Sequence, residues 1–231
     1  MFRGDNCRDE KGIKAIYREA KSLPATVHSI NLVLYFGMLV GHVVTISGAT
    51  KAYLQAPLKS KVPTWVILPR IIWTEEWKRK FTKVACPLHR AMYGHTTAGD
   101  DWHDYFDGIL VNGLKGERVP EFPSLWYFPQ WHVLVASYVD DVIAAGPQEG
   151  VNRFWNEVKK SIQFDEVTTP GRYLGRDHMI YEDDKGRYVH FSMIDYALSA
   201  VEMYEKYYGP LKSCETPFVS DAMLQPEGYQ A

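Results

Sequence analysis

The sequence has few cysteines, little net charge and no long apolar run that is free of glycine. Its three cysteines, Cys7, Cys86 and Cys214, lack metal-ligand spacing and cannot all pair with one another, so we expect a reducing compartment. A formal net charge of −2 excludes a chain that is basic throughout, so any binding of polyanions must be local. Charged residues crowd the start of the sequence, which argues against a signal peptide and favours an intracellular location, cytoplasmic or nuclear.

One uncharged segment, Ser29–Thr50, includes the run LVLYFGMLV and is long enough for a membrane span. Glycines and polar residues, Asn31 and His42 among them, divide it into two shorter apolar groups. We therefore expect a buried helix or turn followed by a core strand, and no membrane. A membrane-anchored or structural protein with a span at residues 29–50 is the alternative interpretation.

The sequence is rich in apolar and aromatic residues, with 46% hydrophobic residues, 15 Tyr, 10 Phe and 7 Trp in 231 residues. This composition suits one folded domain with lobes and excludes a disordered chain. Apolar residues recur at helical spacing in three segments, and we expect each helix to pack one face on a core. The predicted helices lie at residues 102–110, after the N-cap candidates Asp100 and Asp101, at 151–162, and at 194–208.

Strand patterns, rich in β-branched and aromatic residues, lie between these helices. We expect a short strand at Val43–Ile46, a hairpin of Trp131–Tyr138 with Val142–Ala145, and a hairpin of His178–Tyr181 with Tyr188–Phe191. Helices and strands mix without a regular βαβ order. The predicted fold class is therefore α+β rather than a doubly wound sheet.

Two acids, Asp140 and Asp141, interrupt the first of these apolar hairpins. Burying a carboxylate is unfavourable unless it is paired or bound to a metal. Adjacent strand residues point to opposite faces, so both acids can approach one site only at a tight turn. Carboxylate oxygens there suit Mg²⁺. These residues alone favour the other interpretation, a polar hairpin tip without chemistry, because Asp favours turns.

Short motifs around this turn follow one another in an order that resembles the copia-type reverse transcriptases of retrotransposons. Ala52–Leu58 (AYLQAPL) is similar to the family's first palm strand. The family's "YG…W" element is similar to the set Cys86–Leu88, Ala91–His95 (AMYGH), Gly99 and Trp102. Tyr138–Asp141 (YVDD) resembles its YxDD motif, and Ala145–Gly146 follow as in relatives; Pro170–Gly175 (PGRYLG) is similar to its segment near the primer terminus, and Cys214–Pro217 (CETP) to its ending past a thumb helix. Their order and spacing carry the resemblance, which extends over most of the chain.

The resemblance implies a right-hand polymerase palm with partial fingers and the start of a thumb. The implied lobes are partial fingers at 1–40, a palm at 41–180 with an inserted fingers segment at 59–90, and the palm end and thumb start at 181–231. The implied activity is RNA-directed DNA polymerisation, with an RNA or DNA template-primer and deoxynucleotides as partners. In such enzymes the primer 3′-hydroxyl attacks the α-phosphate of a deoxynucleotide, and two Mg²⁺ ions assist.

The resemblance also assigns roles to single residues. Asp140 and Asp141 correspond to catalytic, Mg²⁺-binding carboxylates, and Tyr53, Tyr138 and Gly94 to substrate-binding positions, with Tyr53 similar to the family's gate against a ribose 2′-hydroxyl.

The chain departs from the family at a critical position. The carboxylate expected on the first palm strand is Gly48, and no acid lies within Val43–Leu58 to replace it. The family's usual Lys-Gln pair is Thr96–Thr97, and a frequent Arg beyond it is matched by Asp100. We therefore expect impaired Mg²⁺ binding and a fragment or relic that no longer polymerises. An active polymerase with a carboxylate from elsewhere is the alternative.

One stretch is basic. Residues 59–90 hold eight Lys or Arg against two Glu, and we expect residual nucleic-acid binding there. A solvated surface is the other interpretation of such charge. The predicted contacts are Lys59, Lys61, Arg70, Lys78, Arg79 and Lys80.

Overall fold

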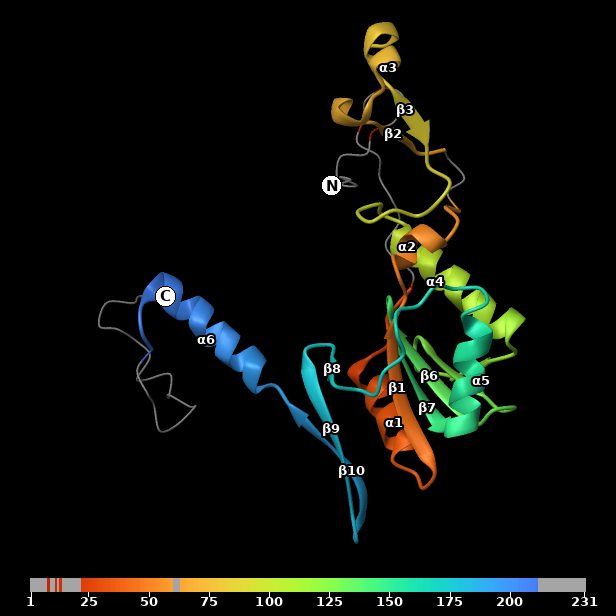
Figure 1. Ribbon diagram of the computed structural model, residues 1–231, viewed down its shortest axis with the longest axis vertical. Helices are drawn as coiled ribbons and strands as arrows, with labels where there is room; N and C mark the ends of the chain where they lie inside the picture. Colours follow the sequence, from red (N-terminus) through yellow and green to blue (C-terminus); the bar gives the residue numbers. More distant parts are fainter. Residues whose placement is uncertain (1–7, 9–10, 12, 14–21, 60–62, 212–231) are drawn as a thin grey trace, which may run out of the picture.

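The computed structural model describes residues 8, 11, 13, 22–59 and 63–211. Within these residues the fold is α+β, with six α-helices and antiparallel sheets, as the sequence predicts. The main sheet has the strand order β1-β7-β6-β5-β4 (Figure 1). Its strands are β1 (His42–Gly48), β4 (Glu117–Arg118), β5 (Leu125–Phe128), β6 (Val133–Tyr138) and β7 (Asp141–Pro147).

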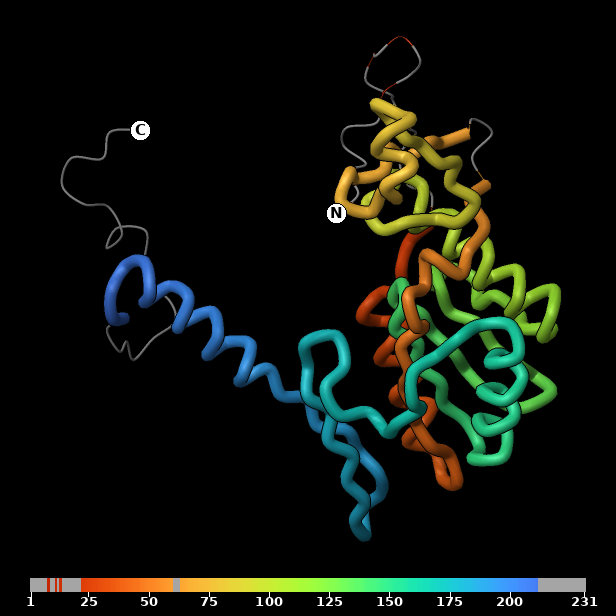
Figure 2. The backbone as a smooth tube through the Cα atoms, turned by 45° about the horizontal axis from the view of Figure 1, so that its top comes forward, coloured from red at the N-terminus to blue at the C-terminus, as the bar shows by residue number. Residues whose placement is uncertain are grey.

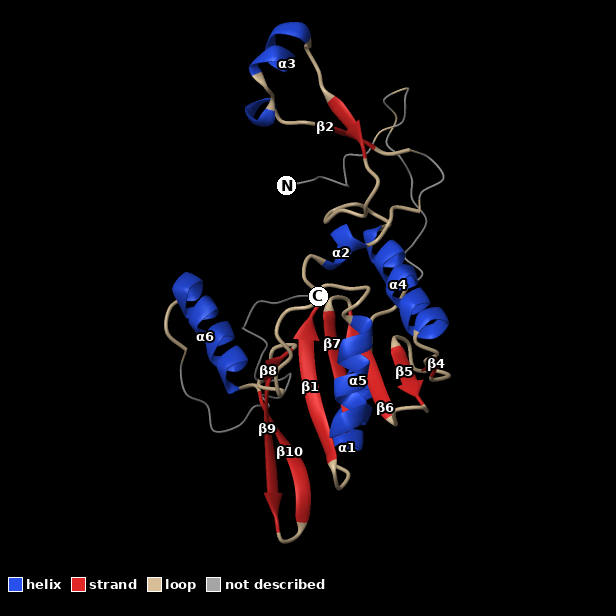
Figure 3. Cartoon of the chain, turned by 45° about the vertical axis from the view of Figure 1, so that its right-hand side comes forward, coloured by secondary structure: helices blue, strands red, loops and turns tan. Residues whose placement is uncertain are grey.

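Helices cover both faces of the main sheet (Figure 3). On one face lies α1 (Val27–Gly37), and on the other lie α4 (Ala98–Gly108) and α5 (Gln148–Val158). Alternate residues of β6 and β7 serve the two faces: Val135 packs with α4 and α5, whereas Ala136 packs with α1. Because both faces are buried, the strand sequences are apolar without alternation.

The segment at residues 29–50 forms most of α1, a turn and β1. None of the helices in the described ranges is long and apolar enough to cross a membrane. The helix-and-strand interpretation of this segment is therefore confirmed, and the single span considered for it is wrong.

The segment Ala52–Leu58 is not the strand that we expected. Residues Ala52–Gln55 form the short helix α2, after Lys51, which has a φ of +51°. The strand beside the acidic hairpin is β1, which ends at Gly48 and contains the predicted Val43–Ile46. A left-handed residue separates the end of β1 from α2, and apolar spacing gives no sign of it.

Helix α4 begins earlier than predicted, at Ala98, with Thr97 rather than Asp100 or Asp101 at its N-cap. Asp101 is instead buried, and it accepts hydrogen bonds from the Thr97 hydroxyl (2.9 Å) and the Lys59 backbone N–H (3.2 Å). Its carboxylate thus holds the backbone at Lys59 against the start of α4 and does not cap the helix.

A narrow extension contains β2 (Trp65–Ile67), β3 (Ala85–Pro87), the 3-10 turn at Arg70–Ile72 and α3 (Glu75–Lys80). It stands away from the main sheet in both Figure 1 and Figure 2. Several of its large apolar side chains are exposed, and among its described residues Trp73 is buried: the exposed ones are Trp65, Ile67, Ile71, Ile72 and Phe81. The extension therefore contributes little to the core.

A second sheet follows α5, in the order β10-β9-β8. It consists of β8 (Arg172–Tyr173), β9 (Arg176–Asp183) and β10 (Gly186–Ser192), and the β9–β10 hairpin is confirmed as predicted. Helix α6 (Ile194–Tyr208) is also confirmed, but it has no buried residue and projects from the body (Figure 2). The expectation that the apolar face of α6 packs on a core is wrong for the described residues. The helical spacing of apolar residues shows that they share one face of the helix, but it does not show what that face packs against.

His178 is a buried titratable residue of this second sheet, 4% exposed between the rings of Tyr173 and Phe191. Its Nδ1 lies 3.2 Å from the carbonyl oxygen of Gly171, so Nδ1–H donates there. Its Nε2 is buried and has no hydrogen-bond partner within the described structure. Burial lowers the pKa of His178 below its usual value, so the folded state favours the neutral ring.

We expect acidification to destabilise the fold through this histidine. Because the folded pKa lies below the unfolded value of about 6.5, the stabilisation is full above pH ~6.5 and is lost as pH falls toward the folded pKa. Thermal unfolding from pH 7.5 to 5 measures it. The fall in Tm is expected to be smaller in His178→Phe, and unchanged in the control His190→Phe, whose histidine is exposed on the same sheet. Equal falls in both variants would contradict the expectation.

Candidate active site at the hairpin of Asp140 and Asp141

The hairpin of β6 and β7 carries both acids at its tip, as predicted. Its last cross-strand pair is Tyr138 with Asp141, so Val139 and Asp140 form a two-residue turn. Val139 has a φ of +59°. For a β-branched residue this conformation is uncommon and costs about 1–3 kcal/mol. The chain therefore holds backbone strain at the point where the acids are presented.

Hydrogen bonds from three elements fix this turn. The carbonyl oxygen of Val139 accepts from Nε1–H of Trp102 (2.7 Å) and from the hydroxyl of Ser137 (2.9 Å). The carbonyl oxygen of Asp140 accepts from the backbone N–H of Ala49 (2.8 Å). Trp102 lies on α4 and is 2% exposed. The indole thus connects the packed core to the strained turn, a role that its helical spacing did not reveal.

Asp141 is half-buried, and its backbone is anchored as well. Burial raises the pKa of Asp141, and the neighbouring charge of Asp140 raises that pKa further. The hydroxyl of Tyr173 donates to the backbone carbonyl oxygen of Asp141 at 3.2 Å. Burial, together with the charge of Asp141, raises the pKa of Tyr173 far above its ordinary value, so this phenol stays protonated as a donor.

Gly48 lies directly across from Asp141 in the register of β1 and β7. A Cβ atom added to Gly48 would lie 3.9 Å from Oδ1 of Asp141 and 3.3 Å from Oδ2 of Asp165. The position where the family resemblance expects a carboxylate therefore faces the hairpin acid as predicted, and a second carboxylate borders it.

Asp165 is the acid that sequence reasoning missed. Its backbone N–H donates to the carbonyl oxygen of Gly48 (2.9 Å), and its backbone carbonyl oxygen accepts from the hydroxyl of Ser47 (3.0 Å). Its side-chain Oδ1 accepts from the hydroxyl of Thr50 (2.8 Å). Single β-bridges, such as Ala49 with Phe164, join this irregular segment to the end of β1. No strand pattern marks it, so the sequence carries no signal that brings Asp165 to position 48.

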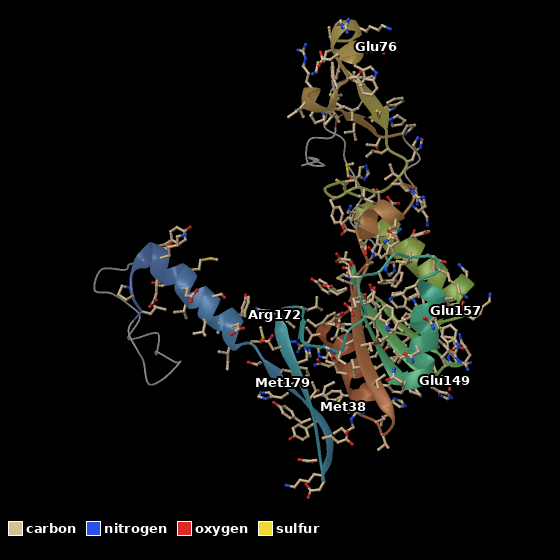
Figure 4. The ribbon with its side chains drawn as sticks, in the orientation of Figure 1. Met38, Glu76, Glu149, Glu157, Arg172 and Met179 are labelled. Atoms are coloured by element: carbon tan, nitrogen blue, oxygen red, sulfur yellow. The ribbon has the colours of Figure 1, made fainter. Side chains whose placement is uncertain are left out.

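The space beside Gly48 and Asp141 is a cavity of about 190 Å³, bordered also by Glu166 and Arg172. Sites for small molecules and cofactors typically measure about 300–1,000 Å³. The Arg172 guanidinium forms an exposed ion pair with Asp195 at 3.5 Å (Arg172 is labelled in Figure 4). This cavity is therefore too small to enclose a nucleotide in the described conformation.

The residues present do not fit the two-Mg²⁺ centre that the resemblance implies. Two ions about 3.5–4 Å apart need carboxylates from more than one side. Here the hairpin supplies two adjacent acids, and position 48 supplies none. The Asp165 carboxylate already accepts a hydrogen bond from the Thr50 hydroxyl. Within the described ranges, no group of three or more His, Cys, Asp or Glu side chains is placed to hold a metal ion.

The predicted substrate-binding residues gather near the hairpin. Tyr53, on α2, lies 4.7 Å from Tyr93 between ring centroids. Burial and the charge of Asp140 raise the pKa of both phenols, which places both rings near that acid. Gly94, with a φ of +88°, follows Tyr93, and Tyr138 is exposed on β6. Tyr93 is the further aromatic residue that the motif reading did not single out.

The predicted nucleic-acid contacts lie mainly on the extension, apart from the hairpin (Figure 1). Several are paired with acids: Lys59 with Asp104 (3.4 Å), Lys78 with Glu75 (2.7 Å) and Lys80 with Glu76 (2.6 Å). Arg70 and Arg79 are exposed, and Lys61 lies outside the described residues. The structure thus gathers Lys78, Arg79 and Lys80 on α3 but does not bring them to Asp140.

The positions that depart from the family pattern have structural partners. The Thr97 hydroxyl lies 3.0 Å from Nδ1 of His95, in addition to its bond to Asp101. Asp100 accepts from both the backbone N–H (2.8 Å) and the hydroxyl (2.7 Å) of Ser22. These hydrogen bonds stabilise the start of α4. Thr97 and Asp100 therefore both have hydrogen-bond partners within the fold.

Neither a protein-family model nor a curated protein matches this chain. The α+β fold and the acidic hairpin are structural facts.

Proposed function

We propose that this chain derives from the polymerase core of a copia-type retrotransposon reverse transcriptase and does not polymerise. The main sheet with its helices would be the palm, the extension an inserted fingers segment, and the second sheet with α6 the end of the palm and the start of a thumb. One observation supports this most directly: β1 pairs with β7 so that Gly48 faces Asp141. The glycine stands at the position where the family resemblance expects a further metal carboxylate.

An active RNA-directed DNA polymerase is the second candidate. Asp165 favours it, since its Oδ2 borders the position of the missing carboxylate. Against it stand the bond of Asp165 to Thr50 and the small cavity beside Gly48. Primer extension by the unmodified chain separates the two candidates.

Residual nucleic-acid binding through the basic extension is expected under either candidate. Phosphate contacts release counterions, so affinity for a primer–template duplex should fall steeply with salt. The slope of log Kobs against log salt should become shallower by about one for each cation removed, as in Arg70→Gln and Arg79→Gln.

Fluorescence anisotropy with a labelled duplex at several salt concentrations measures this slope. Lys185→Gln, a lysine at the turn between β9 and β10, is the matched control and should leave it unchanged. Salt-independent affinity, or no binding at low ionic strength, would count against the proposal.

A further inference from the structure

A hollow of about 640 Å³ lies between α4 and the loop that joins β4 to β5, elements that lie together in Figure 3. Its volume falls in the range of about 300–1,000 Å³ that is typical of ligand sites. The described residues that border it include neither Asp140 nor Asp141, and no role described above uses it. The hollow is therefore separate from the candidate active site.

One wall of this hollow is an acidic face of α4. Its side chains recur at i, i+3, i+4 and i+7, so they share one face of the helix: Asp100, His103, Asp104 and Asp107. Glu121, on the facing loop, adds a fourth carboxylate. Against these four acids the described lining holds one Lys or Arg, which is Arg118. The hollow is therefore negatively charged, which repels phosphate groups and attracts cations.

Two of these carboxylates, Asp104 and Glu121, are accessible to a ligand. Asp104 forms an ion pair with Lys59 at 3.4 Å, but both side chains are at least 50% exposed, and such surface pairs contribute little. Within the described part of the chain, Glu121 has no cationic side chain within 4.0 Å. Asp100, in contrast, accepts two hydrogen bonds from Ser22. A cation that enters the hollow therefore meets two carboxylates without breaking the stronger contacts of the fold.

The fourth carboxylate, Asp107, shows which cation matches a carboxylate of this wall. Nε–H of Arg118 donates to its Oδ1 at 2.8 Å and Nη2–H donates to its Oδ2, so the guanidinium binds through two donors. Nε1–H of Trp126 donates to the same Oδ1 at 3.0 Å. Burial opposes the charge of Asp107, but these donors hold the pKa of Asp107 below its ordinary value. A guanidinium is therefore already paired with a charged carboxylate at the edge of the hollow.

The facing loop gives the hollow a fixed apolar surface. Pro120 and Pro123 restrict the backbone dihedral angles of this loop. The Ser124 hydroxyl donates to the carbonyl oxygen of Leu23 at 2.7 Å, which joins the loop to the chain before α1. Phe122 packs against the core of the main sheet and also borders the hollow. Because the loop is held in place before a ligand arrives, binding loses little conformational entropy.

We propose that this hollow binds an arginine side chain from a basic peptide segment of a partner protein. A guanidinium forms paired hydrogen bonds with a carboxylate and packs its plane on an aromatic ring, and Asp104, Glu121 and Phe122 provide these groups. An ammonium group lacks this planar fork of donors. The hollow has the volume of a site for a drug-sized ligand, so a residue beside the arginine can enter with it. The site goes beyond the proposed function, because it requires neither nucleic acid nor a metal and its charge opposes a polyanion.

Fluorescence anisotropy of a labelled hexapeptide of alternating Arg and Ala, titrated with the purified chain at low ionic strength, tests the proposal. In Asp104→Asn/Glu121→Gln the Kd is expected to weaken at least about tenfold, because both accessible carboxylates become neutral. The control Glu75→Gln/Glu76→Gln removes the same charge from α3 on the extension (Glu76 is labelled in Figure 4) and should bind as the unmodified chain does.

The fold of the variant and the choice of arginine are checked separately. Asp104 and Glu121 are exposed and the substitutions keep their size, so Tm should stay within about 2 °C of that of the unmodified chain. A hexapeptide of alternating Lys and Ala should bind more weakly than the Arg peptide. The proposal is overturned by no binding of the Arg peptide to the unmodified chain, by equal weakening in both double variants, or by equal affinity for the two peptides.

A second copy of the chain is the other source of such an arginine, because Arg70 and Arg79 are exposed on the extension. Sedimentation velocity of the chain alone, at rising concentration, separates the two sources. The chain is expected to sediment as a monomer throughout. Self-association that Asp104→Asn/Glu121→Gln abolishes would assign the hollow to a second copy and would overturn the assignment to a partner protein.

Discussion

The unmodified chain is expected to show no Mg²⁺-dependent primer extension, and Gly48→Asp combined with Asp165→Asn is expected to restore a trace. Both existing acids come from one turn, so the site lacks a carboxylate on the facing strand. A carboxylate at position 48 faces Asp141 from β1. Its charge is expected to raise extension by about 10² over the uncharged control Gly48→Asn/Asp165→Asn, an effect typical of one preorganised electrostatic group.

Asp165 is included because Gly48→Asp alone adds charge to a crowded place. The new side chain would stand between Asp141 and Asp165, whose oxygens lie 3.9 and 3.3 Å from its Cβ position. Without metal, Gly48→Asp should therefore melt about 2–4 °C below the isosteric Gly48→Asn. Adding Asp165→Asn should recover most of that difference. Additive effects of the two substitutions would show that the side chains do not meet.

The decisive contrary result is robust extension by the unmodified chain. If Asp140→Ala abolished that extension, the activity would belong to this hairpin and the inactive assignment would be wrong. An extension that survives Asp140→Ala would come from a contaminant, which makes this variant the control for every assay in the series.

The local spacing of apolar and β-branched residues predicted those helices and strands that pack against a neighbouring element. The apolar run broken by Asp140 and Asp141 predicted the β6–β7 hairpin, and β-branched residues predicted β1. The strand that the family resemblance implied at Ala52–Leu58 is wrong, because the left-handed residue Lys51 precedes a short helix there. Local pattern also gave α6 a core face that no described residue covers.

The candidate site was predictable in part for the same reason. Position 48 was found from a motif, and strand pairing then places it opposite Asp141. Asp165 and the hydrogen bonds of the Gln55 side chain to Gln163 could not be predicted, since both depend on an irregular segment after α5 that returns to β1 and α2. Such contacts are fixed by tertiary hydrogen bonds and leave no periodic trace in the sequence.

Replacing Trp102 is expected to produce the largest loss of stability among the residues around the hairpin. Trp102 is 2% exposed and stacks on Phe106, with ring centroids 5.4 Å apart. Trp102→Ala should lower the free energy of unfolding by about 3–5 kcal/mol. Trp102→Phe keeps most of this packing but removes the N–H that bonds to the Val139 carbonyl oxygen, and should cost about 1–2 kcal/mol. Denaturant unfolding measures both losses.

A second readout distinguishes support of the strained turn from packing alone. The matched control is Trp155→Phe, because Trp155 is 4% exposed in the same core and its Nε1–H donates to the Thr45 hydroxyl at 2.8 Å, away from the turn. Hydrogen exchange of the Ala49 amide, which donates to the Asp140 carbonyl oxygen, reports on the turn directly. It should accelerate in Trp102→Phe beyond what the global loss of stability explains, and follow global stability in Trp155→Phe. If the exchange of the Ala49 amide accelerated equally in both variants, Trp102 would contribute through packing alone. The left-handed conformation of Val139 would then not depend on the hydrogen bond from the indole.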